Sequence, residues 1–178
     1  MSPLTTSAFD LPDRLAATTG VSWVDENCDG VDGVVTDAIF VNAAAAAGGN
    51  GTRTAPFKTV AAGLAAQQSQ SKRYVLVAQG LYRENLRLFD GAQLFGGDSA
   101  DFFRRDPRSY PTTLEGVAPS GAGATLALAP IHAENLGRGA VETVVAGFVI
   151  HGWDVSTAAA EGADGQPSIG VYLRDCGA

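Results

Sequence analysis

The sequence predicts a turn-rich, mostly β protein with one short helix. Its 22 glycines recur at the ends of short apolar runs, which indicates many tight turns between strands of a few residues. Residues 74–78 and 144–150 are nearly continuous apolar runs, typical of strands that are buried on both faces. Such strands fit either an antiparallel sandwich or a parallel solenoid, and the continuous runs favour the solenoid slightly.

The first elements along the chain are a tail, a strand and a helix. Residues 1–20 show no sustained apolar period and are interpreted as a tail or linker. A short strand is expected at 39–41, and a glycine-rich loop follows it. Thr54 as N-cap and Pro56 in the first turn then predict a short helix that ends near Gln68.

The remaining elements are expected to be short strands closed by glycine or by an Asp-Gly turn. Long loops separate some of them, between Asp98 and Pro111 and between Trp153 and Ser168. The expected strands are 74–78, 84–88, 92–95, 113–115, 125–128, 144–150 and 169–173.

The order of these pieces from Ile39 to Gly97 resembles the first coil of pectin-lyase-like right-handed β-helix proteins of bacterial surfaces. The matching pieces are the first strand, the glycine loop, the Ala-Pro-Phe-Lys-Thr-Val run at 55–60, the alanine-rich helix and the segments 75–86 and 91–97. The resemblance implies a mostly β fold: the N-terminal coils of a right-handed parallel β-helix, with a short capping α-helix that covers the open end of the solenoid.

Two regions are expected on this basis. Residues 1–38 form a tail or linker with an acidic, metal-binding-like loop at 25–33. Residues 39–178 form the N-terminal part of the parallel β-helix, which we expect to be truncated at the C-terminus, because no polar cap is apparent after Leu173. An open edge is therefore expected at that end.

Asp25, Asn27, Asp29 and Asp32 are the candidate metal ligands. Asp25, Asn27 and Asp29 with Gly30 reproduce the first half of the calcium-loop pattern, in which alternate oxygen side chains converge because the chain turns sharply at glycine. The twelfth position of that pattern holds Thr36 instead of a bidentate Glu, so an EF-hand is not expected.

The same segment, 25–33, resembles the Asn-Cys-Asp-Gly-x-Asp element of a metal-binding repeat of large secreted bacterial proteins. Only the tail of that repeat is matched. Calcium is therefore the candidate cofactor, and the alternative is an Asx-turn loop that is merely polar.

No catalytic residue is assigned from the sequence. Glu84 belongs to a turn and strand start, and one carboxylate without a partner does not define glycosidase chemistry, which uses two. Asp154, Arg174 and Asp175 fall near strand ends, where a β-helix lyase would place its charged residues, but any solvated face carries such charges too. Trp153 is a candidate sugar-stacking ring, although such a residue more often packs under a loop.

Charge and hydropathy exclude two classes of partner. The formal net charge is −7, and the basic residues form no extended run, so nucleic-acid binding is not expected. No apolar stretch approaches the roughly 18 residues that a membrane-spanning helix needs. The chain is therefore expected to have no membrane span.

The leading hypothesis is a noncatalytic secreted or cell-surface scaffold whose faces bind a polysaccharide or a cell-surface glycan. This hypothesis rests on the family resemblance and on the lack of a recognisable set of catalytic residues in the sequence. The alternative is a fragment of a polysaccharide lyase or glycoside hydrolase whose catalytic coils lie beyond Ala178. No signal peptide is visible in residues 1–20.

The core is expected to come from the apolar residues of the short strands, paired mainly in parallel. These residues are Val75, Leu76, Val77, Leu86, Leu88, Leu94, Phe95, Leu114, Leu126, Phe148, Ile150, Val171 and Leu173.

Overall fold

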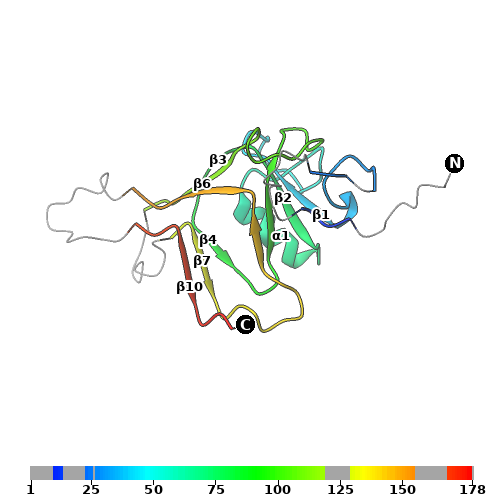
Figure 1. Ribbon diagram of the computed structural model, residues 1–178. Helices are drawn as coiled ribbons and strands as arrows, with labels where there is room; N and C mark the ends of the chain where they lie inside the picture. The colour runs from blue at the N-terminus through cyan, green and yellow to red at the C-terminus, as the bar shows by residue number, and fades with distance from the viewer. Residues whose placement is uncertain (1–9, 14–22, 26, 119–128, 155–167, 178) are drawn as a thin grey trace.

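A computed structural model describes residues 10–13, 23–25, 27–118, 129–154 and 168–177 (Figure 1). Its strands form three parallel sheets. The first sheet has the order β1 (Ala38–Val41), β2 (Tyr74–Ala78), β5 (Gln93–Asp98), β8 (Val144–Ala146). The second has the order β3 (Gly80–Arg83), β6 (Thr112–Glu115), β9 (Phe148–His151). The third has the order β4 (Leu86–Leu88), β7 (Ile131–Glu134), β10 (Val171–Arg174).

Consecutive strands of the chain enter different sheets, and each sheet pairs strands from successive passes. In the first sheet, Val75 of β2 lies opposite Ile39 of β1 and Leu94 of β5. In the second, Leu114 of β6 lies opposite Tyr82 and Ile150. All pairings between the named strands are parallel, so the prediction of mainly parallel pairing is confirmed.

Two apolar clusters lie on opposite faces of the first sheet, because successive side chains of a strand alternate in direction. The inner cluster is built from all three sheets and includes Val75, Leu94, Leu114 and Ile131. The outer cluster contains Phe40, Tyr74, Leu76 and Phe95, together with Val31 and Phe102 from loops.

The helix α1 (Val60–Ser69) begins later than the sequence indicated. Thr59, not Thr54, is its N-cap, and the Thr59 side chain accepts a hydrogen bond from the amide of Ala62 at 3.2 Å. Phe57 instead extends the first sheet: its amide donates to the carbonyl of Phe40 at 2.9 Å. Pro56 therefore precedes the helix and does not lie in its first turn.

The predicted fold class is wrong. The described residues form a mixed α/β structure, with three short parallel sheets of three or four strands and one α-helix, and not a mostly β right-handed parallel β-helix. The helix belongs to the core: Val60 and Leu64 are buried in the inner cluster, and a Cβ on Gly63 would lie 2.5 Å from Cγ2 of Val41. The glycine-closed apolar runs that carried the resemblance encode short parallel strands, which more than one architecture uses.

Residues of the expected tail segment pack against the first sheet. Val31 is buried in the outer cluster, and Asp10 is also fully buried. A short 3-10 turn, η1 (Val35–Asp37), leads directly into β1. The described parts of residues 1–38 thus cover one face of the sheet and bring polar side chains to it.

Candidate ligand-binding site

The loop after β5 begins with a turn that its own side chains hold. The Ser99 hydroxyl donates to Oδ1 of Asp101 at 2.6 Å, and the amide of Phe103 donates to the same oxygen at 3.2 Å. The amide of Arg104 donates back to the Ser99 hydroxyl at 3.1 Å. The two bonds to the Asp101 carboxylate, the one from Ser99 foremost, lower the pKa of Asp101 because they favour its ionised form. The turn is therefore held by the chain's own hydrogen bonds.

A second turn closes the loop in the same way. The Ser109 hydroxyl donates to Oδ2 of Asp106 at 2.6 Å, and the amide of Arg108 donates to Oδ1 at 3.0 Å. The amide of Tyr110 donates to the carbonyl of Asp106 at 2.8 Å. The bond from Ser109 is the main reason that the pKa of Asp106 is lowered.

Between these turns, the two outer side chains of residues 102–105 face the core and the two inner ones face solvent. Phe102 is 1% exposed and packs edge-on against Phe40, with ring centroids 4.9 Å apart, whereas Phe103 is 58% exposed. Arg104 is exposed, whereas Arg105 is buried. Phe102 and Arg105 anchor the loop, and Phe103 and Arg104 are presented to solvent.

Arg105 joins three separate segments of the chain. Its Nη1 donates to Oδ2 of Asp32 at 2.6 Å and to the carbonyl of Asp13 at 2.6 Å, and its Nε donates to the carbonyl of Gly96 at 2.9 Å. Burial raises the pKa of Asp32 to about 6, although the Arg105 guanidinium opposes that rise. Arg105 therefore ties residues 13 and 32 to β5.

Trp23 is held beside this ion pair. Its indole Nε1 donates to the carbonyl of Asp13 at 3.1 Å, and the Arg105 guanidinium lies 5.3 Å from the centroid of its ring. The amide of Asp13 in turn donates to both carboxylate oxygens of Asp32 at 3.2 Å. The tryptophan is thus positioned by the same network that anchors the loop after β5.

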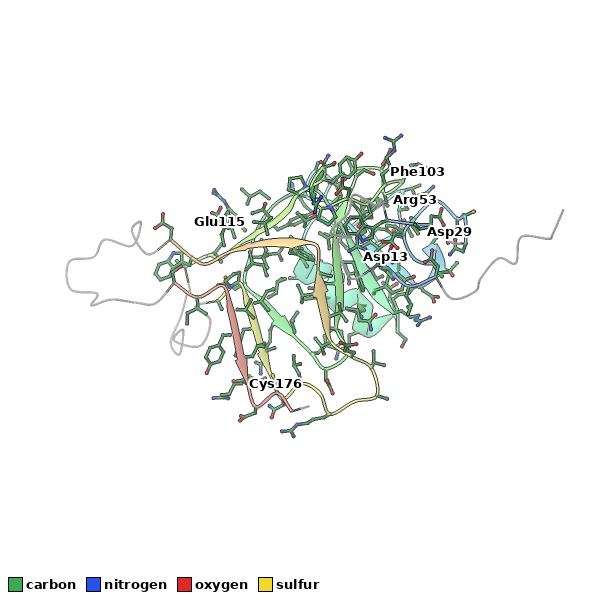
Figure 2. The ribbon with its side chains drawn as sticks, viewed as in Figure 1. Asp13, Asp29, Arg53, Phe103, Glu115 and Cys176 are labelled. Carbon is green, nitrogen blue, oxygen red and sulfur yellow. The ribbon has the colours of Figure 1, made fainter. Side chains whose placement is uncertain are left out.

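A cavity of about 360 Å³ lies between the N-terminal segments and this loop. Three aromatic side chains line it: Trp23, Phe103 and Tyr110. Its charged lining residues are Asp25, Asp32, Asp106, Arg104 and Arg105. Figure 2 shows Asp13, Asp29, Arg53 and Phe103 gathered at this end of the molecule, well away from Cys176.

The loop predicted to bind metal closes on itself through hydrogen bonds. The carboxylate of Asp25 accepts the amides of Asp29 and Gly30, and Oδ1 of Asn27 also accepts the amide of Asp29. The carboxylate of Asp29 accepts the amides of Val31 and Val35. Gly30 has a φ of +91°, as the sharp turn in the calcium-loop pattern requires.

The structure brings Asp25, Asn27 and Asp29 into one loop but places Asp32 elsewhere. The carboxylate of Asp32 faces Arg105 in the buried network. No cluster of three or more His, Cys, Asp or Glu side chains suited to a metal is found among the described residues. Each carboxylate oxygen has a second lone pair beyond the one that an amide occupies, so the three side chains keep acceptor capacity for a hard cation.

The residues weighed for catalysis have other contacts. The carboxylate of Glu84 accepts the first two amides of α1, those of Val60 at 2.8 Å and Ala61 at 2.9 Å. Arg174 forms ion pairs with Glu134 and with the neighbouring Asp175.

Asp154 is exposed, and Trp153 is buried at 8% exposure. Trp153 therefore packs in the interior and does not present its ring to a sugar. Both cysteines, Cys28 and Cys176, are free and exposed.

Sequence reasoning treated the segment between Asp98 and Pro111 only as a long loop and missed the cavity. The signal was present in Ser99-x-Asp101 and Asp106-x-x-Ser109, two pairs of turn-forming side chains that flank Phe-Phe-Arg-Arg. Two phenylalanines and two arginines follow one another between these turns. One residue of each pair can then anchor the loop in the core while the other faces solvent.

No family model, no curated protein and no solved structure matches this chain. Within the described ranges, no helix is long and apolar enough to cross a membrane. The arrangement of the cavity therefore carries the functional argument. Its aromatic faces, carboxylate acceptors and guanidinium donors suit a ligand that has both apolar faces and hydroxyl groups.

Proposed function

We propose that this protein is a noncatalytic carbohydrate-binding protein of the extracellular space or cell surface, and that the ligand occupies the cavity between Trp23 and Phe103. The observation that carries the proposal is a concave site lined by three aromatic side chains, two of them, Phe103 and Tyr110, on a loop held by its own hydrogen bonds. Pyranose rings offer C–H faces for aromatic rings and hydroxyls for charged acceptors and donors. A preorganised loop also loses less conformational entropy when the ligand binds.

The proposal favours binding over hydrolysis because the acidic side chains around the cavity have other roles. A glycosidase needs one carboxyl group free to donate a proton and a second free to act as base or nucleophile. Here Asp106 holds the Ser109 turn, and Asp32 is paired with Arg105. The alternative, part of a polysaccharide lyase or hydrolase, predicts release of reducing or unsaturated chain ends, which a direct assay on polysaccharides detects.

A glycan array with purified protein tests the proposal. We expect selective binding that a Phe103→Ala variant loses by tenfold or more, because the exposed ring supplies much of the contact area. Leu81→Ala is the matched control, since Leu81 is 47% exposed on β3 and does not line the cavity. An array without a reproducible signal, or equal losses in the two variants, would refute the proposal.

Calcium belongs to the proposal as a structural ion of the loop that Asp25, Asn27 and Asp29 form. Asp25 and Val31 of this loop also line the cavity, so an ion held here would stiffen one wall of the glycan site. Three side chains do not fill a shell of six to eight oxygens, so backbone carbonyls and water would complete it. A Kd of about 10⁻⁴ to 10⁻³ M is expected, as for extracellular modules.

Calorimetry with calcium tests this part separately. An Asp25→Asn, Asp29→Asn double variant keeps the shape of both side chains but removes two charges, so we expect its calcium heats to vanish. An Asp37→Asn, Asp175→Asn variant carries the same charge change at residues outside the loop and should titrate like the wild type. If the wild type gives only heats of dilution, the loop is an Asx-turn structure without an ion.

A further inference from the structure

A second cavity, of about 540 Å³, adjoins the first. Ser99, Ala100 and Asp101 line it on one side. Phe103, Arg104 and Tyr110 line both cavities and therefore form the wall between them. Each volume lies within the range of small-molecule sites, about 300 to 1,000 Å³. The two hollows are therefore neighbours on the surface of the molecule.

The shared wall is held in place. The Arg53 guanidinium lies 4.3 Å from the centroid of the Phe103 ring, and Arg53 Nη1 donates to the carbonyl of Gly30 at 3.4 Å. A Cβ added to Gly30 would lie 3.1 Å from the Phe103 ring, so this glycine lets the ring approach the N-terminal loop closely. Phe103 is exposed but confined, as a fixed stacking surface requires.

The charges of the lining disfavour an anionic ligand. Three carboxylates and two guanidiniums line the first cavity, and the second has one of each, those of Asp101 and Arg104. An anionic ligand would meet an excess of carboxylates in the first cavity and no excess of positive charge in the second. Acceptors and donors are both present, which suits hydroxyl groups, since these donate and accept.

We propose that the two cavities are adjacent subsites for consecutive residues of one uncharged glycan chain, with Phe103, Arg104 and Tyr110 between them. This inference rests on the proposed glycan-binding function and specifies its ligand as an extended neutral chain and not a monosaccharide or a chain of uronic acids. Occupying the second subsite after the first adds affinity, because the second contact is then intramolecular.

Calorimetry with oligosaccharides of increasing length tests the inference. The probes are β-1,4-linked glucose, mannose and xylose oligomers of one to six residues, and galacturonic acid oligomers of the same lengths as charged counterparts. For at least one neutral series we expect affinity to rise tenfold or more between the monosaccharide and the tetrasaccharide. Galacturonic acid oligomers should bind more weakly than that series at every length.

An Ala100→Trp variant separates the subsites. Ala100 is exposed and lines only the second of the two cavities, so the indole fills that hollow and leaves Trp23 and Phe103 in place. We expect this variant to keep the wild-type affinity for the shortest ligand that binds and to lose the gain with length. Ala65→Trp is the matched control, because Ala65 is exposed on α1 and lines neither cavity, and it should behave like the wild type.

The outcomes distinguish this inference from the function on which it rests. Equal affinity for short and long neutral oligomers, with a silent Ala100→Trp variant, overturns the two-subsite inference and leaves glycan binding intact. The inference that the ligand is uncharged is overturned if the galacturonic acid series binds more tightly or if none of the three neutral series binds. A glycan array without a reproducible binding signal refutes the proposed function itself.

Discussion

Asp98 is a fully buried carboxylate at the end of β5, and neither of its oxygens has a hydrogen-bond partner among the described residues. Burial raises its pKa well above the usual 3.8, and the nearby Arg105 charge opposes this only in part. The folded state therefore holds this proton more tightly than the unfolded chain does. Stability contributed by the protonated form is present at low pH and is lost as the pH rises above about 4.

We therefore expect an Asp98→Asn variant to be more stable than the wild type at pH 8, by on the order of 1 to 3 kcal/mol, because the wild type must either bury the charge or take up a proton when it folds at that pH. At pH 4, where the folded wild type also carries a neutral side chain, the two proteins should differ little. Urea unfolding across this pH range measures the difference. If the wild type instead became more stable than the variant as the pH rises, the raised pKa of Asp98 would be contradicted.

The two neighbouring phenylalanines of the loop after β5 should contribute very differently to stability. Phe102→Ala removes a side chain that is 1% exposed and packs on Phe40, so a loss of about 3 to 5 kcal/mol is expected. Phe103→Ala removes a side chain that is 58% exposed, so stability should change by no more than about 0.5 kcal/mol. Thermal unfolding of both variants tests this contrast, and comparable losses would mean that the anchoring and presenting roles are misassigned.

Single residues also show where sequence reasoning succeeded. The core residues expected on β2 and β5 are buried, because nearly continuous apolar runs identify strands covered on both faces, and those on β4 and β6 are buried on the inner face of alternating strands. These residues are Val75, Leu76, Val77, Leu86, Leu88, Leu94, Phe95 and Leu114. Leu126 lies outside the described residues. The cavity was missed, since its lining comes from loops without periodicity, and its Asp13–Asp32–Arg105 contacts join residues 19 and 73 positions apart.

At the scale of elements, the start of α1 depends on a distant side chain. The carboxylate of Glu84, between β3 and β4, accepts the amides of Val60 and Ala61, which have no partner within the helix. The negative charge also interacts favourably with the helix dipole. This contact could not be predicted from the sequence, because Val60 and Glu84 are 24 residues apart and no local motif links them.

Replacing Glu84 with alanine should cost about 1 to 2 kcal/mol, and Glu84→Gln, which keeps an acceptor but not the charge, should cost less. Urea denaturation monitored by circular dichroism measures both losses. Glu115→Ala is the matched control: its carboxylate pairs with the exposed Arg83 at 3.2 Å, and surface pairs contribute about 0 to 1 kcal/mol. A larger loss for Glu115→Ala than for Glu84→Ala would contradict the capping role.

At the scale of the whole molecule, each sheet has one of its two edges formed by a strand from the C-terminal part of the chain, and this strand has no outer neighbour among the described residues. β8, β9 and β10 each lie at the edge of a sheet, and Figure 1 places β10 across the molecule from β1. Val171 and Leu173 of β10 pair with the buried Ile131 and Ala133, yet they are 45% and 57% exposed. Their assignment to the core was therefore wrong: the apolar pattern shows which way a strand faces, not whether another strand covers it.

Phe148 and Ile150 on β9 are likewise only partly buried, although they pack against the inner cluster. Unpaired strand edges with apolar side chains beside them favour pairing with another chain. These three strands also carry few charges to oppose such pairing, since His151 and Arg174 are the basic residues on them and they contain no acidic residue. Among the described residues, the outer sides of these three strands are therefore where association would occur.

We accordingly expect the protein to self-associate in a concentration-dependent way through these edges, and a Leu173→Lys variant to shift it towards the monomer, because an inward-pointing charge on an edge strand opposes strand addition. Sedimentation velocity over a hundredfold range of concentration measures the shift. Val117→Lys adds the same charge at a residue that is 37% exposed and lies outside the strands, so its association should match that of the wild type. A wild type that stays monomeric throughout, or two lysine variants that associate equally, would show that these edges do not drive pairing.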